Sequence, residues 1–162
     1  MMEYLYQEKV QSRKTSLLFL LLMLIFFALF AWRFSAVGFR ALPVVCLFFA
    51  LFFVFYLINY RILKINISED AVLLKFGLVR WKTVLANIQT INLDDSPAWI
   101  KYGGAGVHFA FVYRRYRAFY NFLEHPRVLI TFHHKQGPVQ ELVFTTRYPQ
   151  EVIQIIQARL KK

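Results

Sequence analysis

The sequence predicts an α+β protein in which a membrane-spanning helical hairpin precedes a bent antiparallel β-sheet or barrel capped by a C-terminal helix. Three observations support this fold class: two long uncharged apolar runs near the N-terminus, alternating apolar and polar residues through the rest of the chain, and one amphipathic stretch near the C-terminal end. Of the 162 residues, 58% are hydrophobic and 18 are Phe, which is too apolar for an ordinary soluble chain of this length. The composition therefore indicates an integral membrane protein.

The residues outside the apolar runs are strongly basic. Lys and Arg number 20 against nine Asp and Glu, and the net charge is +11. This excess suits the anionic cytoplasmic face of a membrane or another polyanion. A single Cys cannot form an intramolecular disulfide, and the four His residues show no zinc-ligand spacing. We therefore expect no disulfide scaffold, no metal and no cofactor.

Two uncharged runs have the length that a bilayer crossing requires. Residues 15–32 contain no charged side chain, and at about 1.5 Å per residue they reach about 27 Å, close to the hydrocarbon thickness of a bilayer. Residues 41–60 form a second run with Pro43 near its start, where a missing backbone N–H is tolerated. The intervening residues 33–40 form a short external loop that can only reverse the chain. The pattern therefore predicts a transmembrane hairpin.

A cleaved secretory signal is the alternative for the first run, since basic residues precede it. The run is longer than a typical signal core, however, and Trp32-Arg33-Phe34 lacks the small residues that signal peptidase requires. We therefore expect a retained helix.

The flanking charges give the hairpin an orientation. Its connecting loop carries only Arg33 and Arg40, whereas its outer flanks carry more cations. The positive-inside rule therefore places both termini in the cytoplasm, with residues 1–14 as an N-terminal segment and residues 61–162 as a cytoplasmic domain of a multi-pass inner-membrane protein. The cations of the outer flanks are Lys9, Arg13, Lys14, Arg61, Lys64, Lys75 and Arg80.

Residues 61–162 show the period-two alternation of half-buried strands. Leu63, Ile65 and Ile67 alternate with polar residues up to a turn at Ser68-Glu69-Asp70. Further strands are expected over residues 72–76 and 79–83, from about 107, over 128–132 and around 142–144. Ile88, Ile91 and Leu93 mark a short connector that feeds a fourth strand, which ends at residues 94–97.

The chain closes with an amphipathic helix over residues 149–160. Pro149 suits a first helical turn, and Glu151 complements the helix dipole there. One stripe of this helix is apolar and consists of Val152, Ile153, Ile156 and Leu160. We expect this helix to cap the sheet.

The order of these elements resembles a pleckstrin-homology-like (PH-like) domain of the bacterial type, a module often carried after one or two transmembrane helices. The segments that carry the resemblance are INISEDAVLLKFG (residues 65–77), IQTI (88–91), YGGAGV (102–107) and FTTRYPQEV (144–152). They cover most of residues 61–162. The resemblance implies a PH-like domain beside the bilayer, but it transfers no ligand, because no basic loop here matches a phosphoinositide or peptide motif.

Residues 109–125 depart from that pattern, because they are longer and more aromatic than a tight connection between strands. Arginines on lipid phosphates and aromatic rings at the headgroup boundary would make an interfacial contact. The alternatives are a protein interface and an ordinary β-hairpin with aromatic residues in the core and solvated arginines at its tip. The candidate contacts are Tyr113, Arg114, Arg115, Tyr116 and Arg117, together with Arg61 and Lys64 just beyond the second apolar run.

Other partners and activities find less support in the sequence. Basic residues among aromatics also fit single-stranded nucleic acid, but no nucleic-acid motif is present and a membrane-held domain is a poor place for one. The glycines at 103–106 lack the Lys-Ser/Thr of a P-loop, His133 and His134 would point to opposite strand faces, and Asp94-Asp95 is expected to be a solvated turn. We expect no catalytic residues, no cofactor-binding residues and no nucleic-acid partner.

The sequence therefore favours a non-catalytic, membrane-tethered binding or scaffold module at the cytoplasmic membrane face. Its expected partners are a membrane protein, anionic lipid headgroups, or both. A structural or accessory subunit of a larger membrane complex is the alternative, with homo-oligomerisation left open. A lipid-acting membrane enzyme is the third hypothesis, which has no visible nucleophile and base to support it.

Overall fold

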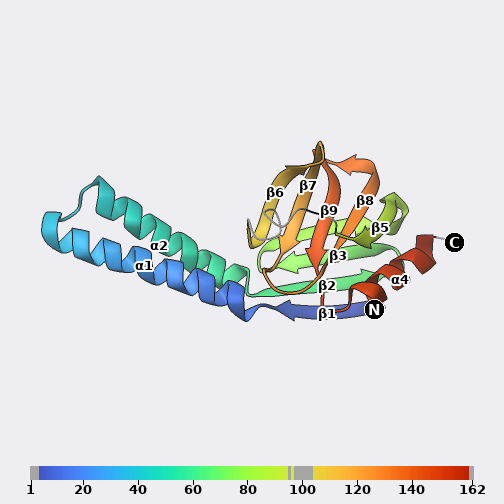
Figure 1. The fold of residues 1–162 in the computed structure, drawn as a ribbon, viewed down its shortest axis with the longest axis horizontal. Coiled ribbons are helices and arrows are strands. Elements are labelled where there is room, and N and C mark those ends of the chain that lie inside the picture. Colours follow the sequence, from blue (N-terminus) through green and yellow to red (C-terminus); the bar gives the residue numbers. More distant parts are fainter. Residues whose placement is uncertain (1–3, 95, 97–103, 161–162) are drawn as a thin grey trace.

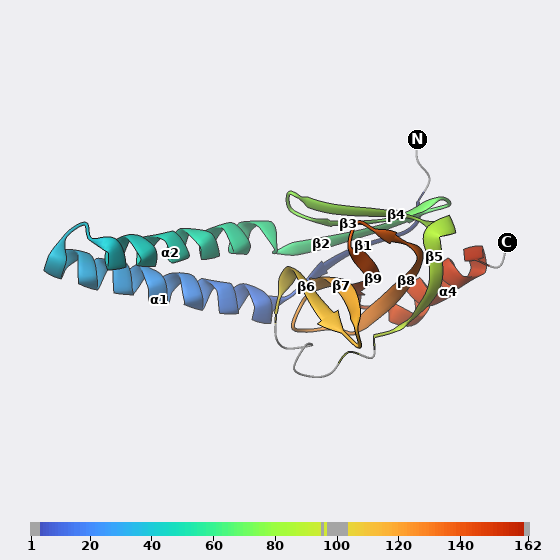
Figure 2. The same ribbon diagram turned by 90° about the horizontal axis from the view of Figure 1, so that it is seen from above.

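The computed structural model describes residues 4–94, 96 and 104–160. A hairpin of two long helices, α1 (Arg13–Val37) and α2 (Ala41–Asn59), projects from one end of a β-rich body (Figures 1 and 2). The body consists of two sheets and the C-terminal helix α4 (Pro149–Leu160). The α+β arrangement predicted from the sequence is confirmed.

Helix α1 begins where its first free N–H groups find a cap. Ser12 precedes the helix, and its hydroxyl accepts a 3.0 Å hydrogen bond from the backbone N–H of Thr15. The helix ends at Gly38, whose positive φ of 64° suits glycine. It therefore extends past Trp32 as far as Val37, and the chain reverses over fewer residues than the expected 33–40 loop.

Both helices are long and apolar enough to cross a membrane. Only 11% of the apolar window of α1 and 17% of that of α2 are buried within the protein, so most of each helix lies outside its core. Large side chains such as Phe27, Phe48 and Leu51 point outward over the length of the hairpin. An exposed apolar surface of this extent requires lipid or another protein to cover it.

The hairpin is inserted between two paired strands. Strand β1 (Tyr4–Gln11) leads into α1, and strand β2 (Ile62–Ser68) follows α2 after a turn. The two strands pair antiparallel, with Val10 opposite Leu63. The residue pattern does not indicate β1, because Glu8 occupies an inward position between Tyr6 and Val10 and interrupts the apolar alternation. The folded body therefore includes residues 4–11 as well as the segment that follows the hairpin.

The first sheet is antiparallel and has the order β1-β2-β3-β4. The second has the order β5-β8-β9-β7-β6, and among its described strands β7 and β9 pair in parallel. The prediction of an entirely antiparallel sheet is wrong at this point. Strand β8 does not pair with β7 but lies on the far side of β9. Strand β9 therefore returns between them and runs in the same direction as β7. The remaining bounds are β3 (Ala71–Phe76), β4 (Val79–Val84), a 3₁₀ turn η1 (Leu85–Asn87), β5 (Ile88–Leu93), β6 (Gly106–Val112), β7 (Arg115–Asn121), β8 (Arg127–Gln136) and β9 (Val139–Thr145).

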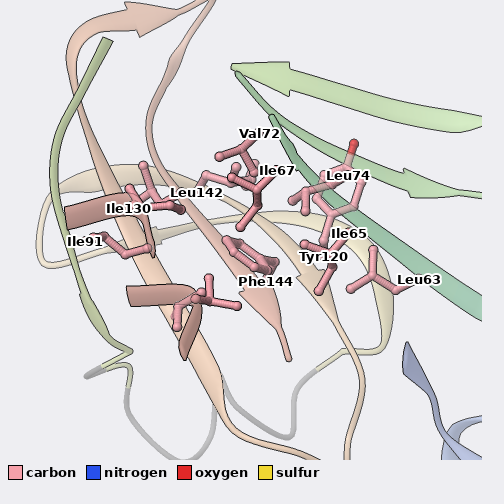
Figure 3. Packing of buried hydrophobic residues seen from close by; sticks show 14 of the residues in the cluster. Leu63, Ile65, Ile67, Val72, Leu74, Ile91, Tyr120, Ile130, Leu142 and Phe144 are labelled. Carbon is pink, nitrogen blue, oxygen red and sulfur yellow. The ribbon is translucent and has the colours of Figure 1, made fainter. Parts of the chain in front are cut away.

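The main core lies between the two sheets (Figure 3). Ile65 and Ile67 of β2 are fully buried and belong to the same cluster as Tyr120 and Phe144 of the second sheet. Helix α4 packs against β5, β8 and β1 and adds its apolar stripe to this cluster. Each such side chain stabilises the fold by about 1.5–3 kcal/mol when it leaves water, so the core holds both sheets as one body.

Candidate membrane-surface site

The end of α2 is locked onto the first sheet by Asn59. Its amide nitrogen donates a 3.0 Å hydrogen bond to the carbonyl of Phe55, and its side-chain oxygen accepts a 3.3 Å hydrogen bond from the N–H of Leu78. Gly77 in the same β3–β4 turn has a φ of 50°, and a Cβ there would lie 2.6 Å from the Asn59 side-chain oxygen. The helix end and the turn therefore fit only with glycine at this position.

The start of α1 is held by the connection between β7 and β8. The Thr15 hydroxyl accepts a 3.3 Å hydrogen bond from the N–H of Leu123, and the Glu124 carboxylate accepts a 2.9 Å hydrogen bond from the N–H of Lys14. Thr15 is buried at this contact. Both helices of the hairpin are thus attached to the body at their ends, one to each sheet.

Arg61 and Lys64 lie where the sequence placed them, exposed beside the end of α2. Together with Lys75 they line a surface hollow of about 240 Å³. Its other lining residues include Ile58 at the end of α2, which is 71% exposed. The hollow therefore has cations on the side of the body and an apolar side chain on the side of the hairpin.

Lys64 also belongs to a row of cations that crosses the whole first sheet. It is the register partner of Lys9 on β1 and of Lys75 on β3, and Lys75 is in turn the partner of Arg80 on β4. All four are exposed. The sequence shows them only as flanking charges, because register between strands is not visible in the order of residues. We call Lys9, Lys64, Lys75 and Arg80 the cation row.

The aromatic and basic segment around residue 113 forms a β-hairpin, which was one of its three interpretations. Tyr113 and Arg114 make a two-residue turn between β6 and β7, with φ angles of 49° and 66°. Tyr113 and Phe111 are exposed, and half-buried Tyr116 packs its ring on Phe111 at a centroid distance of 4.9 Å and on Phe109 at 5.8 Å. The tip and the β6 strand therefore present an aromatic surface rather than only solvated arginines.

Arg117 is not on the surface, so the expectation that it contacts a membrane or a partner is corrected. Its side chain is 3% exposed and forms ion pairs with Glu141 on β9 and, at 3.6 Å, with Asp94. Asp94 in turn lies 2.6 Å from Arg127 and is not the solvated turn residue expected from the sequence. The alternation of β7 places Arg117 on the outer face of the second sheet, where these carboxylates meet it. Arg115 is both at the surface and part of this ion-pair cluster, because its side chain is 55% exposed and pairs with Glu141 at 2.7 Å.

The remaining sequence hypotheses concern other chemistry. Within the described residues, no three His, Cys, Asp or Glu side chains converge as metal ligands. Gly103 and Asp95 lie outside the described residues.

Burial, followed by the nearby charge of Arg127, lowers the pKa of His108 on β6, so this imidazole is neutral at neutral pH. The ring of His108 stacks on that of Phe119 at 4.8 Å.

Comparison with protein-family models, with curated proteins and with solved structures gives no match to this chain.

Proposed function

We propose that the protein is a non-catalytic, membrane-tethered binding or scaffold module. In this proposal α1 and α2 cross the inner (cytoplasmic) membrane, both termini lie in the cytoplasm, and the body is a PH-like domain held against the cytoplasmic membrane face. There it contacts a membrane-protein partner, anionic lipid headgroups, or both.

The attachment of the hairpin to the body carries the proposal. Strand β1 runs into α1 through the single capping residue Ser12, and Asn59 ties the end of α2 to the β3–β4 turn. A flexible linker would let a domain sample many distances from the bilayer, whereas these contacts fix the body at the helix ends. Surface contacts that are weak in free solution become populated when the tether keeps them at high effective concentration.

The charges beside the helix ends support the proposed orientation. Arg13, Lys14 and Arg61 lie at the end that joins the body and are exposed. The positive-inside rule favours this end in the cytoplasm. The two packed sheets and the closing helix α4 are compatible with a PH-like module, and the parallel β7–β9 pair is the feature that departs from the expected pattern.

Membrane insertion and orientation are tested on the full chain. Alkaline carbonate treatment of vesicles should leave the protein in the pellet, and a C-terminal tag should be cut by protease in inverted vesicles but protected in intact cells. Release by carbonate contradicts the tether, and cleavage of the tag in intact cells contradicts the orientation. The full chain is required, because a fragment that begins at residue 61 lacks strand β1 of the first sheet.

A subunit role in a larger membrane complex is the second candidate, and the aromatic surface of β6 favours it. Phe109 is 49% exposed and Phe111 is 71% exposed on this strand, which lies at the edge of the second sheet. Gly106 at the start of β6 lies against the ring of Tyr60, so the strand starts beside the end of α2 (Figure 1). Exposed aromatic rings on an edge strand are typical of protein interfaces.

Site-specific photocrosslinking in native membranes tests this role. A photoreactive amino acid in place of Phe111 should give one discrete heterologous product if the strand is a subunit interface, and a product of twice the chain mass if the protein forms a homo-oligomer. The matched control is the same amino acid in place of exposed Gln89 on β5. Equal products from both positions would contradict a specific interface.

A further inference from the structure

We propose that the cation row binds the headgroups of anionic phospholipids in the bilayer that hosts the hairpin. The inference rests on the proposed function and assigns a lipid class and a site to it. The site comprises Lys9, Lys64, Lys75 and Arg80, and it continues into the hollow beside Arg61.

The cation row destabilises the protein itself. Like charges directly opposite one another on neighbouring strands destabilise a sheet, and the row contains three such pairs in succession. Within the described part of the chain, no carboxylate lies within ion-pair distance of any of the four side chains. An external anion would remove this repulsion, and it would bind best where several cations face it together.

The cation row lies close to the end of α2. Lys75 lies just before Gly77, which touches Asn59 at the end of α2. At about 3.3 Å per residue, Lys64 is no more than about 17 Å of chain beyond Asn59. Flexible Lys side chains extend this reach toward the helix ends, and anionic lipid attracts cations within about 10 Å of the surface. The row therefore lies within reach of headgroups in the proposed orientation.

An apolar groove continues from the hollow onto the hairpin. This groove of about 790 Å³ shares Ile58 and Arg61 with the hollow. Between the helices it is lined by Leu17, Leu20 and Leu57. A phospholipid combines a charged and an apolar part in the same arrangement: its phosphate suits the cations, and its acyl chain suits the leucines. An acidic protein segment would satisfy the cations but not the apolar groove, so the geometry favours lipid.

The proposal is tested with the full chain in nanodiscs of phosphatidylcholine, with and without phosphatidylglycerol. The variant carries Lys64→Gln and Lys75→Gln, the central pair of the row. The matched control carries Lys82→Gln and Lys135→Gln, which remove the same charge from exposed positions outside the row. Two quantities are measured: the thermal unfolding midpoint, and the affinity for phosphatidylglycerol from lipid titration in mixed micelles.

The wild-type midpoint should rise with phosphatidylglycerol, and this rise should shrink at high salt. Without anionic lipid, the Lys64/Lys75 variant should unfold at a higher temperature than wild type, because the repulsion is gone. Its affinity for phosphatidylglycerol should fall about fivefold per removed charge, the factor that corresponds to about 1 kcal/mol for each cation near the surface. The control should keep the wild-type response in both measurements.

An unchanged lipid response in the Lys64/Lys75 variant would overturn the proposal, as would an equal loss in the control. The proposal would also be overturned if an acidic protein co-purified with the wild type but not with the Lys64/Lys75 variant, while phosphatidylglycerol had no effect on the wild type or on the variant. Failure of the full chain to enter nanodiscs would instead contradict the membrane tether. Failure of the lipid site and failure of the tether are therefore distinguishable.

Discussion

The buried carboxylate of Glu8 on β1 accepts a 2.6 Å hydrogen bond from the hydroxyl of Thr146, which lies between β9 and α4. It also accepts hydrogen bonds from the Tyr6 hydroxyl at 2.9 Å and from the N–H of Arg147 at 3.0 Å. Burial, together with the neighbouring Glu8 carboxylate, raises the pKa of Tyr6, so this hydroxyl stays protonated and donates. The contact joins the strand that enters the hairpin to the last part of the domain.

Replacing Glu8 with Ala should destabilise the protein by about 3 kcal/mol, because the donors of Tyr6, Thr146 and Arg147 would lose their acceptor. The measurement is the free energy of unfolding of the full chain in detergent micelles. Glu69→Ala is the matched control: Glu69 is 61% exposed and pairs with Arg159, so its loss should cost less than about 1 kcal/mol. Equal effects of the two substitutions would contradict the structural role of Glu8.

Replacing Gly77 with Ala should loosen the attachment of α2 to the first sheet. The new Cβ would meet Asn59 atoms at 2.6 and 2.7 Å, in addition to the strain of a positive φ. Gly137 has a similar φ of 61° with nothing within 4 Å of an added Cβ, so Gly137→Ala isolates the strain. We expect about 1 kcal/mol for Gly137→Ala and at least about 2–3 kcal/mol for Gly77→Ala, measured as changes in unfolding free energy. Equal changes in unfolding free energy for the two variants would show that the contact between Gly77 and Asn59 adjusts without a loss of stability.

Replacing Glu141 with Gln should destabilise the second sheet by about 3 kcal/mol, because it removes a buried negative charge from beside Arg117. Arg115→Ala tests the exposed partner of the same carboxylate and should cost less than about 1 kcal/mol. Chemical denaturation of both variants gives the comparison. A larger effect for Arg115 than for Glu141 would contradict the buried arrangement.

Acidification should destabilise the protein partly through His108. Its pKa is lowered from the ordinary value of 6.5 in the folded state, so the unfolded chain binds a proton more readily. The contribution of His108 to stability is therefore full above pH 6.5 and declines as the pH falls from there toward the lowered folded pKa. In His108→Phe, which keeps a ring against Phe119, the loss of unfolding midpoint between pH 7.5 and about 5.5 should be smaller than in wild type. Exposed His134→Phe is the control and should leave the pH dependence unchanged.

Much of the architecture could be predicted from local periodicity. The inward positions Leu63, Ile65 and Ile67 are fully buried as their alternation indicated, and α4 buries Val152, Ile153 and Ile156. The two uncharged runs are helices with outward-facing apolar side chains. These features are local because the side chains of one strand or helix already define which face must leave water.

Arg117 and Glu8 show where local patterns fail. The sequence left Arg117 at a membrane surface, at a protein interface or solvated at a hairpin tip, but a strand pattern does not reveal whether the outer face of its sheet is covered. Glu8 makes strand β1 hard to recognise from the sequence. A charged residue at an inward position is acceptable only when donors from distant parts of the chain, such as Thr146, form hydrogen bonds with it.

Residue type and short-range spacing are enough to indicate two apolar helices, the strand faces that form the core and the excess of positive charge. Strand pairing in the folded protein decided that residues 4–11 complete the first sheet and that β9 runs parallel to β7. It also decided that Lys9, Lys64, Lys75 and Arg80 stand side by side. The physical reason is that strand pairing joins residues far apart in the chain, so the field of four aligned cations exists only once the sheet has formed.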